Sequence, residues 1–173
     1  GLTQNTSLIS IGFVAENNQQ FYAEFIDYNQ SQCDDWIKTH VIQNCRWLNT
    51  DVLPDSLIIE NKNNCLSVCG NKIQIKEQLS EWLKQFKSVE IWADCYAYDW
   101  VLFCELFGGA LHIPGNVFYM PADISTLFLL KGLDMDIDRE TFSELELSDE
   151  LHKHNALYDA LVTRACYEKL LSV

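Results

Sequence analysis

The chain has 173 residues, of which 25 are Asp or Glu and 12 are Lys or Arg, so its formal net charge at pH 7 is −13. This length predicts a single domain, and a hydrophobic content of 48% is ample for a packed core. A protein that coats duplex nucleic acid needs clustered Lys and Arg, and no dense basic run exists here, so bulk electrostatic binding is disfavoured. A site that holds divalent cations among carboxylates is still allowed, because the cations can bridge to a phosphate.

Seven cysteines are an odd number without the paired short spacings of a disulfide framework, so they are expected to be free thiols in a reducing cytoplasm. Cys65 and Cys69 lie four residues apart, but no second Cys or His pair follows at a zinc-finger distance, which disfavours structural zinc. The longest apolar runs are too short to span a bilayer, and neither a signal peptide nor a membrane partner is expected.

The first half of the chain predicts a hairpin and a helix. Residues 7–25 are typical of two strands around a polar turn at 16–20. Apolar residues at three- and four-residue spacing predict a helix over 30–45. Residues 46–73 are left unassigned, apart from turns that Pro54 and an Asn-rich stretch indicate.

The second half of the chain combines helices with one predicted strand. An amphipathic pattern predicts a helix over 75–86, and residues 89–93 are typical of a short buried strand. A turn and an apolar helix follow, and a pair of glycines ends that helix. Two more helices are expected over 122–131 and 155–171. An opening antiparallel pair followed by alternating elements predicts an α/β fold, with a mixed sheet flanked by helices.

Two short segments place acids and a histidine where a metal could use them. Asp94 ends the predicted strand and Asp99 opens the next helix, which is a common position for ligands at the rim of an α/β sheet. His154 lies just before the last helix, and Asp159 lies on the first turns of that helix. Mg²⁺ prefers carboxylate oxygens, and a His with an unperturbed pKa of about 6.5 can take a proton from an attacking water.

Each of these residues also has a structural interpretation. Asp99 could cap its helix, and Asp94 could belong to the turn. Taken alone, His154 and Asp159 are typical of a solvated helix start. Two other histidines show no readable carboxylate arrangement and are interpreted as structural or surface residues: His40 and His152.

The acidic stretch over 134–150 has the alternating aspartates of a calcium loop. However, Arg139 occupies the position where such a loop needs Gly, and Leu145 occupies the position where it needs a bidentate Glu. A calcium site is therefore not expected, and the stretch is interpreted as a solvated connection that carries much of the negative charge.

At these acidic and histidine segments the sequence resembles the DEDDh 3′–5′ exonucleases of the RNase T and DnaQ-like superfamily. The segment HNALYDA matches the third family motif, His-x-Ala-x-x-Asp-Ala, at His154, Ala156, Asp159 and Ala160. The segment WADCYAYDWVLF is similar to the second motif, with Asp99 at the motif's Asp. Within the superfamily the chain most resembles the small bacterial and phage exoribonuclease-like proteins, and the resemblance covers most of its length.

The resemblance implies an RNase H-like fold and the removal of nucleotides from the 3′ end of single-stranded RNA or DNA. It also implies two Mg²⁺ or Mn²⁺ ions held by four acids, with Asp99 and Asp159 as two of the metal ligands and His154 as general base. A homodimer is compatible with the resemblance, although the sequence shows no heptad that would argue for one. Weaker candidates for substrate binding at the strand end are Asp94, Tyr96, Tyr98 and Trp100.

The family's first motif, an Asp-x-Glu on the central strand, is absent from this chain. In the family it ends a few residues before a Gly-Leu such as Gly1 and Leu2, so we expect the native protein to have a preceding strand with both acids. The single domain over 1–173 is then N-terminally incomplete, and this chain is expected to bind metal poorly and to be inactive. Two alternatives stay open: a catalytically silent nucleic-acid-binding or assembly module with the same fold, and an α/β protein without a nuclease role.

Overall fold

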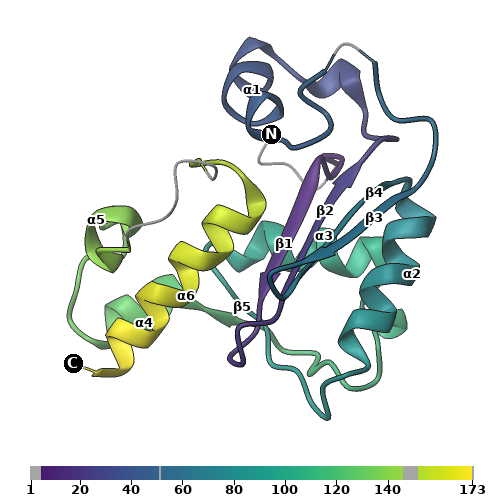
Figure 1. Ribbon diagram of the computed structural model, residues 1–173. Helices are drawn as coiled ribbons and strands as arrows, with labels where there is room; N and C mark the ends of the chain where they lie inside the picture. Colours follow the sequence, from purple (N-terminus) through teal and green to yellow (C-terminus); the bar gives the residue numbers. More distant parts are fainter. Residues whose placement is uncertain (1–4, 51, 146–151, 173) are drawn as a thin grey trace.

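A four-stranded mixed sheet forms the centre of the molecule (Figure 1). The structure is a computed structural model that describes residues 5–50, 52–145 and 152–172. The strands of the sheet are β1 (Ser10–Val14), β2 (Gln20–Phe25), β3 (Ile58–Lys62) and β4 (Cys65–Gly70). Their order is β1-β2-β4-β3, with β2 and β4 parallel and the two outer pairs antiparallel. The prediction of an α/β fold with a mixed sheet is therefore confirmed.

The predicted N-terminal hairpin is confirmed as β1 and β2. Asn18 takes a positive φ of 65° in the turn, and the backbone N–H of Ala15 donates to the carbonyl of Gln19. Every residue of β2 after Gln20 is buried, which explains why the segment is so apolar.

A second hairpin, β3 and β4, occupies part of the region that the sequence left unassigned. Asn63 and Asn64 both adopt positive φ between the two strands, as a two-residue hairpin turn requires. The Asn-rich stretch is therefore this turn. β3 is an edge strand in which Ile59 is exposed and Glu60 is half-buried, so it lacks the alternation that identifies a strand from sequence.

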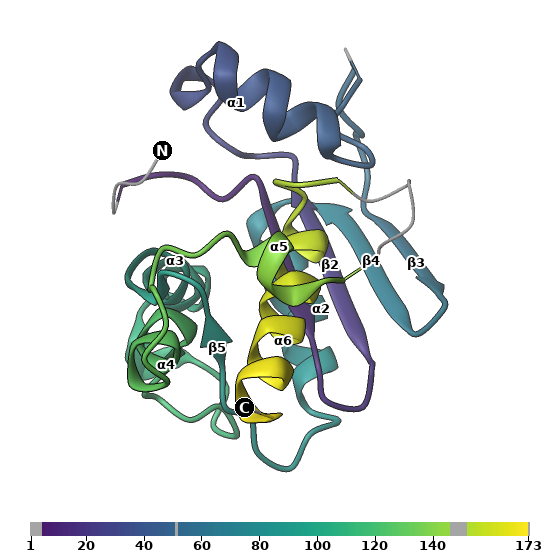
Figure 2. The same ribbon diagram turned by 90° about the vertical axis from the view of Figure 1, so that its left-hand side faces the viewer.

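Helices cover both faces of the sheet (Figures 1 and 2). Helix α2 (Lys72–Leu83) begins at a capping box formed by Asn71 and Gln74, and it lies on one face. Helix α6 (Ala156–Ser172) lies on the other face, against β1. The helices predicted over 75–86 and 155–171 are confirmed, although α2 begins and ends three residues earlier than expected.

The alternation of side chains along β2 separates these two faces. Phe21 and Phe25 belong to the main core, together with residues of α2 and of α3 (Tyr96–Phe107). Tyr22 faces the opposite side, where Asn155 beside the start of α6 donates to its hydroxyl oxygen. The glycine pair follows α3 directly, as predicted.

A smaller parallel sheet joins two short strands in the second half of the chain. Its strands and the helix that follows are β5 (Trp92–Ala93), β6 (Ala122–Asp123) and α4 (Ile124–Leu130). The strand predicted over 89–93 is confirmed in its last two residues, while Val89 forms an isolated bridge to Val117. The helix predicted over 122–131 is corrected at its start, because the first two residues form β6 and the second of them caps α4.

The helix predicted over 30–45 is wrong as one continuous element. The segment forms a short helix, α1 (Asp35–His40), with a single 3₁₀ turn on either side. Asp34 caps α1 by accepting from the backbone N–H of Ile37, and Cys45 is extended, so the helical pattern is interrupted at both ends.

The described part of the acidic stretch, residues 134–145, is more ordered than the solvated connection that the sequence predicted. It contains helix α5 (Arg139–Ser143), and the Arg139 side chain is only 16% exposed because it pairs with Asp94. Residues 146–150 of the stretch lie outside the described part of the chain, as do Gly1 and Leu2.

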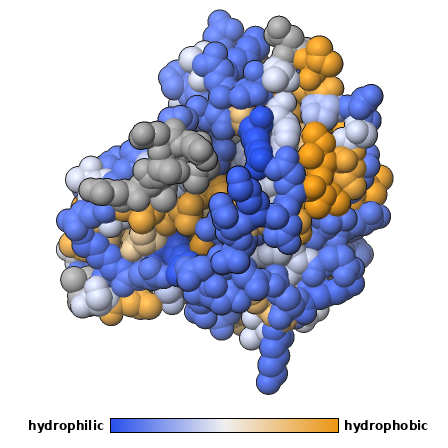
Figure 3. Space-filling model, viewed as in Figure 1, coloured by the Kyte–Doolittle hydropathy of each residue, from blue (hydrophilic) through white to orange (hydrophobic). Residues whose placement is uncertain are grey.

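Hydrophilic residues cover most of the face shown in Figure 3, in keeping with the net charge of −13. Across the described residues, no helix is both long and apolar enough to cross a membrane. All seven cysteines are free thiols, and the four buried ones fill small spaces in the protein interior.

Candidate functional site

A cleft of about 1300 Å³ lies between β1 and β5. The two strands belong to separate sheets, and residues of α3 and α6 complete the walls of the cleft. The cleft is lined by five residues that the sequence singled out: Asp94, Asp99, Trp100, His154 and Asp159. The fold therefore brings together two segments that are far apart in the chain.

Helix α6 reaches this cleft because β1 carries a glycine where the two elements meet. A Cβ atom on Gly12 would lie 2.3 Å from the carbonyl oxygen of Ala156, which is far inside van der Waals contact. Only the absence of a side chain lets the first turn of α6 rest on β1. That contact places His154 and Asp159 at the wall of the cleft.

Asp99 lies in the first turn of α3 and is exposed within the cleft. Its helix begins after Cys95, so Asp99 does not occupy the N-cap position. Desolvation, followed by the negative charges of Asp94 and Asp159, raises the pKa of Asp99 to about 6. Asp99 and Asp159 are therefore close enough to interact electrostatically.

The segment that leads into α6 holds the backbone of His154 against Asp159. His154 has a positive φ of 69°, and its backbone N–H donates to Oδ1 of Asp159 at 3.2 Å. Desolvation raises the pKa of the Asp159 carboxyl, whereas this hydrogen bond and the charge of His154 oppose the increase. Asp159 is exposed, but it belongs to a defined contact at the helix start.

A buried polar network holds the start of α6, and sequence reasoning missed it. Asn155 caps the helix by accepting from the backbone N–H groups of Leu157 and Tyr158, and its amide donates to the Tyr22 hydroxyl at 3.1 Å. Tyr22 in turn donates to Glu24 at 2.6 Å, and burial raises the pKa of the Tyr22 hydroxyl. The sequence signal was available, because Glu24 stands among apolar residues of a buried strand.

Glu24 is fully buried, and backbone donors surround its carboxylate. The N–H groups of Trp47 and Leu48 donate to Oε2 at 2.9 and 3.0 Å, and the N–H of Arg46 donates to Oε1. These bonds fix the segment that follows α1 against the sheet. The same network therefore positions both the α1 region and the start of α6.

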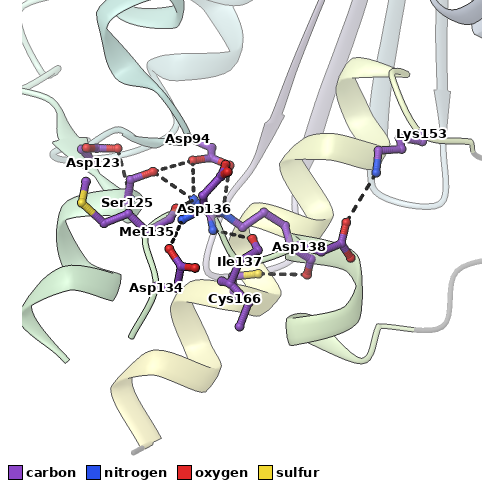
Figure 4. Close-up of polar contacts among 11 residues, drawn as sticks. Asp94, Asp123, Ser125, Asp134, Met135, Asp136, Ile137, Asp138, Lys153 and Cys166 are labelled. Carbon is purple, nitrogen blue, oxygen red and sulfur yellow. Dashed lines mark hydrogen bonds and ion pairs between the residues drawn. The ribbon is translucent and has the colours of Figure 1, made fainter. Parts of the chain in front are cut away.

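Asp94 lies in a second polar cluster at the end of β5 (Figure 4). Both of its carboxylate oxygens accept from the Arg139 guanidinium, and Ser125 Oγ donates to Oδ1 at 2.9 Å. Arg139 also donates to the carbonyl oxygens of Met135 and Ile137. Sequence reasoning missed Arg139, because its partner Asp94 lies 45 residues earlier in the chain.

The three aromatic candidates differ in position. Trp100 lines the cleft and stacks on Phe103, with ring centroids 5.3 Å apart. Tyr96 is exposed at the start of α3, and neither it nor Tyr98 is part of the cleft lining. The structure therefore places only Trp100 of the three beside the acids.

The acids of the cleft meet only part of what a metal ion needs. Asp99 and Asp159 offer the carboxylate oxygens that Mg²⁺ and Mn²⁺ bind, whereas Asp94 is already paired with Arg139. Among the residues that the structure describes, no group of three or more Asp, Glu, His or Cys side chains could hold a metal. The described residues therefore do not form a complete metal site.

Two comparisons with known proteins agree on the family. The family model described as "3'-5' exoribonuclease Rv2179c-like domain" matches residues 1–171, which is nearly the whole chain. Two curated proteins from Mycobacterium tuberculosis strains are each 30% identical over 112 residues. Their names are "3'-5' exoribonuclease Rv2179c" in strain ATCC 25618 / H37Rv and "3'-5' exoribonuclease MT2234.1" in strain CDC 1551 / Oshkosh.

These alignments cover 64% of this chain and 57% of each relative, so the chain spans somewhat more than half the length of the curated proteins that it matches. The family model, by contrast, reaches both the strand pair at the start and the helix that carries the HNALYDA segment. On the strength of that match, the chain belongs to the Rv2179c-like 3'-5' exoribonuclease domain family.

Proposed function

We propose that this chain is the catalytic domain of a 3′–5′ exoribonuclease, which removes nucleotides from RNA 3′ ends by hydrolysing phosphodiester bonds. The observation that carries the proposal is the convergence of Asp99, His154 and Asp159 on one cleft, from two distant segments. Family membership and the names of the two relatives support the same activity. RNA is the expected substrate, and single-stranded DNA is the comparison substrate.

His154 is the proposed general base. It lines the cleft next to two carboxylates, and an imidazole can accept a proton from water near neutral pH. The hydrogen bond from its backbone to Asp159 and the cap formed by Asn155 fix the backbone from which the ring projects. These contacts support a positioned base in a DEDDh-type arrangement on an RNase H-like fold.

Mg²⁺ or Mn²⁺ would neutralise developing charge on the phosphate, and Asp99 and Asp159 would supply part of its coordination shell. Because the described residues offer no complete metal site, the other coordination positions are left to water, to phosphate oxygens of the substrate and to acids from another segment. We propose that a strand bearing two acids enters the cleft between β1 and β5. β1 is at the edge of its sheet, so it has an edge free to pair with such a strand within the described part of the chain.

The test uses the full-length protein and a short single-stranded RNA with a 5′ fluorescent label. With Mg²⁺ or Mn²⁺ present, we expect a ladder of products that shorten from the 3′ end. Asp99→Asn, Asp159→Asn and His154→Ala should each abolish the ladder, whereas Asp55→Asn should not, because Asp55 is exposed and lies outside the cleft. Trimming that survives Asp159→Asn would contradict the proposed function.

A catalytically silent nucleic-acid-binding module is the second candidate, and the incomplete metal site is the observation that favours it. Such a module would bind the labelled RNA without shortening it at any divalent cation concentration. Binding without hydrolysis by the full-length protein would therefore select this candidate. The seven free thiols suit either candidate in a reducing compartment such as the cytoplasm.

A further inference from the structure

An exposed tryptophan lies directly beside the proposed general base. Trp36, on α1, stacks on the ring of His40, with centroids 4.9 Å apart and planes inclined by 19°. The same indole meets the His154 ring edge-on, at 5.1 Å and 69°. Trp36 is nevertheless 52% exposed, so much of its surface is open to a ligand.

The position of Trp36 relative to His154 is fixed by hydrogen bonds that do not involve the indole. Asn44 donates to the carbonyl oxygens of His40 and Lys153, each at 2.7 Å. Asn155 donates to the carbonyl oxygen of Asn44 at 2.9 Å. The α1 region is thus held against the start of α6, and the large exposed ring is not needed as its anchor.

Resting on the proposed exoribonuclease function, we propose that Trp36, backed by His40, is a stacking platform for an unpaired base of the RNA strand near the bond to be cut. Unpaired bases stack on aromatic side chains, and such stacking tolerates any base sequence. With 12 Lys and Arg against 25 Asp and Glu, the chain has few cations that could pair with RNA phosphates. Base stacking would supply binding energy for single-stranded RNA that does not depend on basic residues. The substrate-binding candidates that the sequence offered beside β5, namely Asp94, Tyr96, Tyr98 and Trp100, do not make this ring contact with His154.

The platform is distinct from Trp100, the aromatic candidate that lines the cleft. Trp100 is packed against Phe103 within the main core, whereas Trp36 lies outside the cleft lining, on the side where His154 is found. An RNA 3′ end whose scissile phosphate lies near His154 would therefore place one neighbouring base beside Trp36.

The experiment compares a short 5′-labelled oligoadenylate with versions that lack one base, at each position near the 3′ end in turn. We measure kcat/KM for hydrolysis by the full-length protein and by its Trp36→Ala variant. The wild-type protein should lose about ten-fold or more when one particular base is removed, the size expected for one base–aromatic stack. On the intact oligonucleotide, Trp36→Ala should have a kcat/KM that is lower than that of the wild-type protein by a similar factor. On the oligonucleotide that lacks this base, the variant and the wild-type protein should have similar kcat/KM values.

Trp36→Phe keeps a ring at this position and should retain most of the base dependence. Tyr119→Ala is the matched control, because Tyr119 is 65% exposed but does not line the cleft. Equal losses on intact and abasic strands in Trp36→Ala would mean that the indole acts only through His154, and would overturn the inference. A change in oligomeric state of Trp36→Ala on gel filtration would assign the ring to a subunit interface and also overturn it.

Binding measured with the same oligonucleotides separates this inference from the proposed function. Fluorescence anisotropy could show that the protein binds the intact oligonucleotide more tightly than the abasic one, that this preference depends on Trp36, and that no hydrolysis occurs. That result would support the stacking platform and contradict the enzymatic activity. Hydrolysis that shows the same rate with and without each base would keep the activity and contradict the platform.

Discussion

The guanidinium of Arg139 donates to both carboxylate oxygens of Asp94, with Nε 2.9 Å from Oδ2 and Nη2 3.1 Å from Oδ1. This pair ties α5 to the end of β5, close to the helix that carries Asp99. Lys153, the residue before His154, forms an ion pair with Asp138 at the start of α5 (Figure 4) and another with Glu140. Helix α5 therefore connects the two segments that form the cleft.

Replacing Arg139 by Met should lower the free energy of unfolding by about 2 kcal/mol, because Asp94 keeps its charge in a partly buried place and retains only the hydrogen bond from Ser125. Urea denaturation of the two proteins measures this difference. Lys84→Met is the matched control: it breaks an ion pair with Glu81 whose partners are both largely exposed, so a change within about 0.5 kcal/mol is expected. Equal effects of the two substitutions would contradict the role assigned to Arg139.

Replacing Glu24 by Gln should destabilise the protein by about 3 kcal/mol. The carboxylate accepts from three backbone N–H groups and from Tyr22, and an amide would turn a donor toward some of these donors in a buried place. Tyr22→Phe removes only the hydroxyl and should cost about 1 kcal/mol. Thermal or urea unfolding checks both values, and an unchanged stability of Glu24→Gln would refute the proposed network.

Replacing Gly12 by Ala should destabilise the protein by about 3 kcal/mol and reduce activity, because the new methyl group would collide with the backbone of Ala156. Helix α6 would have to move away from β1 and carry His154 and Asp159 with it. Gly115→Ala is the control, since nothing lies within 4 Å of a Cβ at that position. Both variants are compared by unfolding and by RNA hydrolysis, and a stable, fully active Gly12→Ala protein would disprove the close contact.

Without divalent cations, the stability of the protein should depend on Asp99 between about pH 4 and about pH 6. The pKa of Asp99 is about 6 in the folded chain, above its value of about 4 in an unfolded chain. The folded state therefore binds the proton more tightly, so the contribution of Asp99 to stability is largest below about pH 4 and is lost as the pH rises through 6.

The measurement is the free energy of unfolding against pH for the wild-type protein and for Asp99→Asn. The difference in unfolding free energy between the two proteins separates the effect of Asp99 from that of the other acids. As the pH rises, the wild-type protein should lose stability relative to Asp99→Asn. Solvent around the exposed carboxylate will keep this effect small. Parallel curves over the whole range would contradict the raised pKa.

Local patterns were sufficient for several elements. The N-terminal hairpin has apolar strands around a polar turn, and the last helix has a continuous stripe over many residues, so short-range periodicity identifies both. The edge strand β3 could not be recognised, because Ile59 is exposed and Glu60 is half-buried. The broken helix at 30–45 was misjudged, since apolar spacing alone does not reveal where capping residues interrupt a helix.

By itself, the sequence determined which residues could carry out chemistry: the spacing of His154 and Asp159 at one helix start, and Asp99 at another, is local and can be read along the chain. Only the tertiary structure decided which residues meet. It placed these three on one cleft, paired Asp94 with Arg139, and joined Asn155 to Tyr22 across 133 residues. The reason is physical: hydrogen bonds, desolvation and ring contacts depend on distances in space, and these distances are set by packing between distant segments.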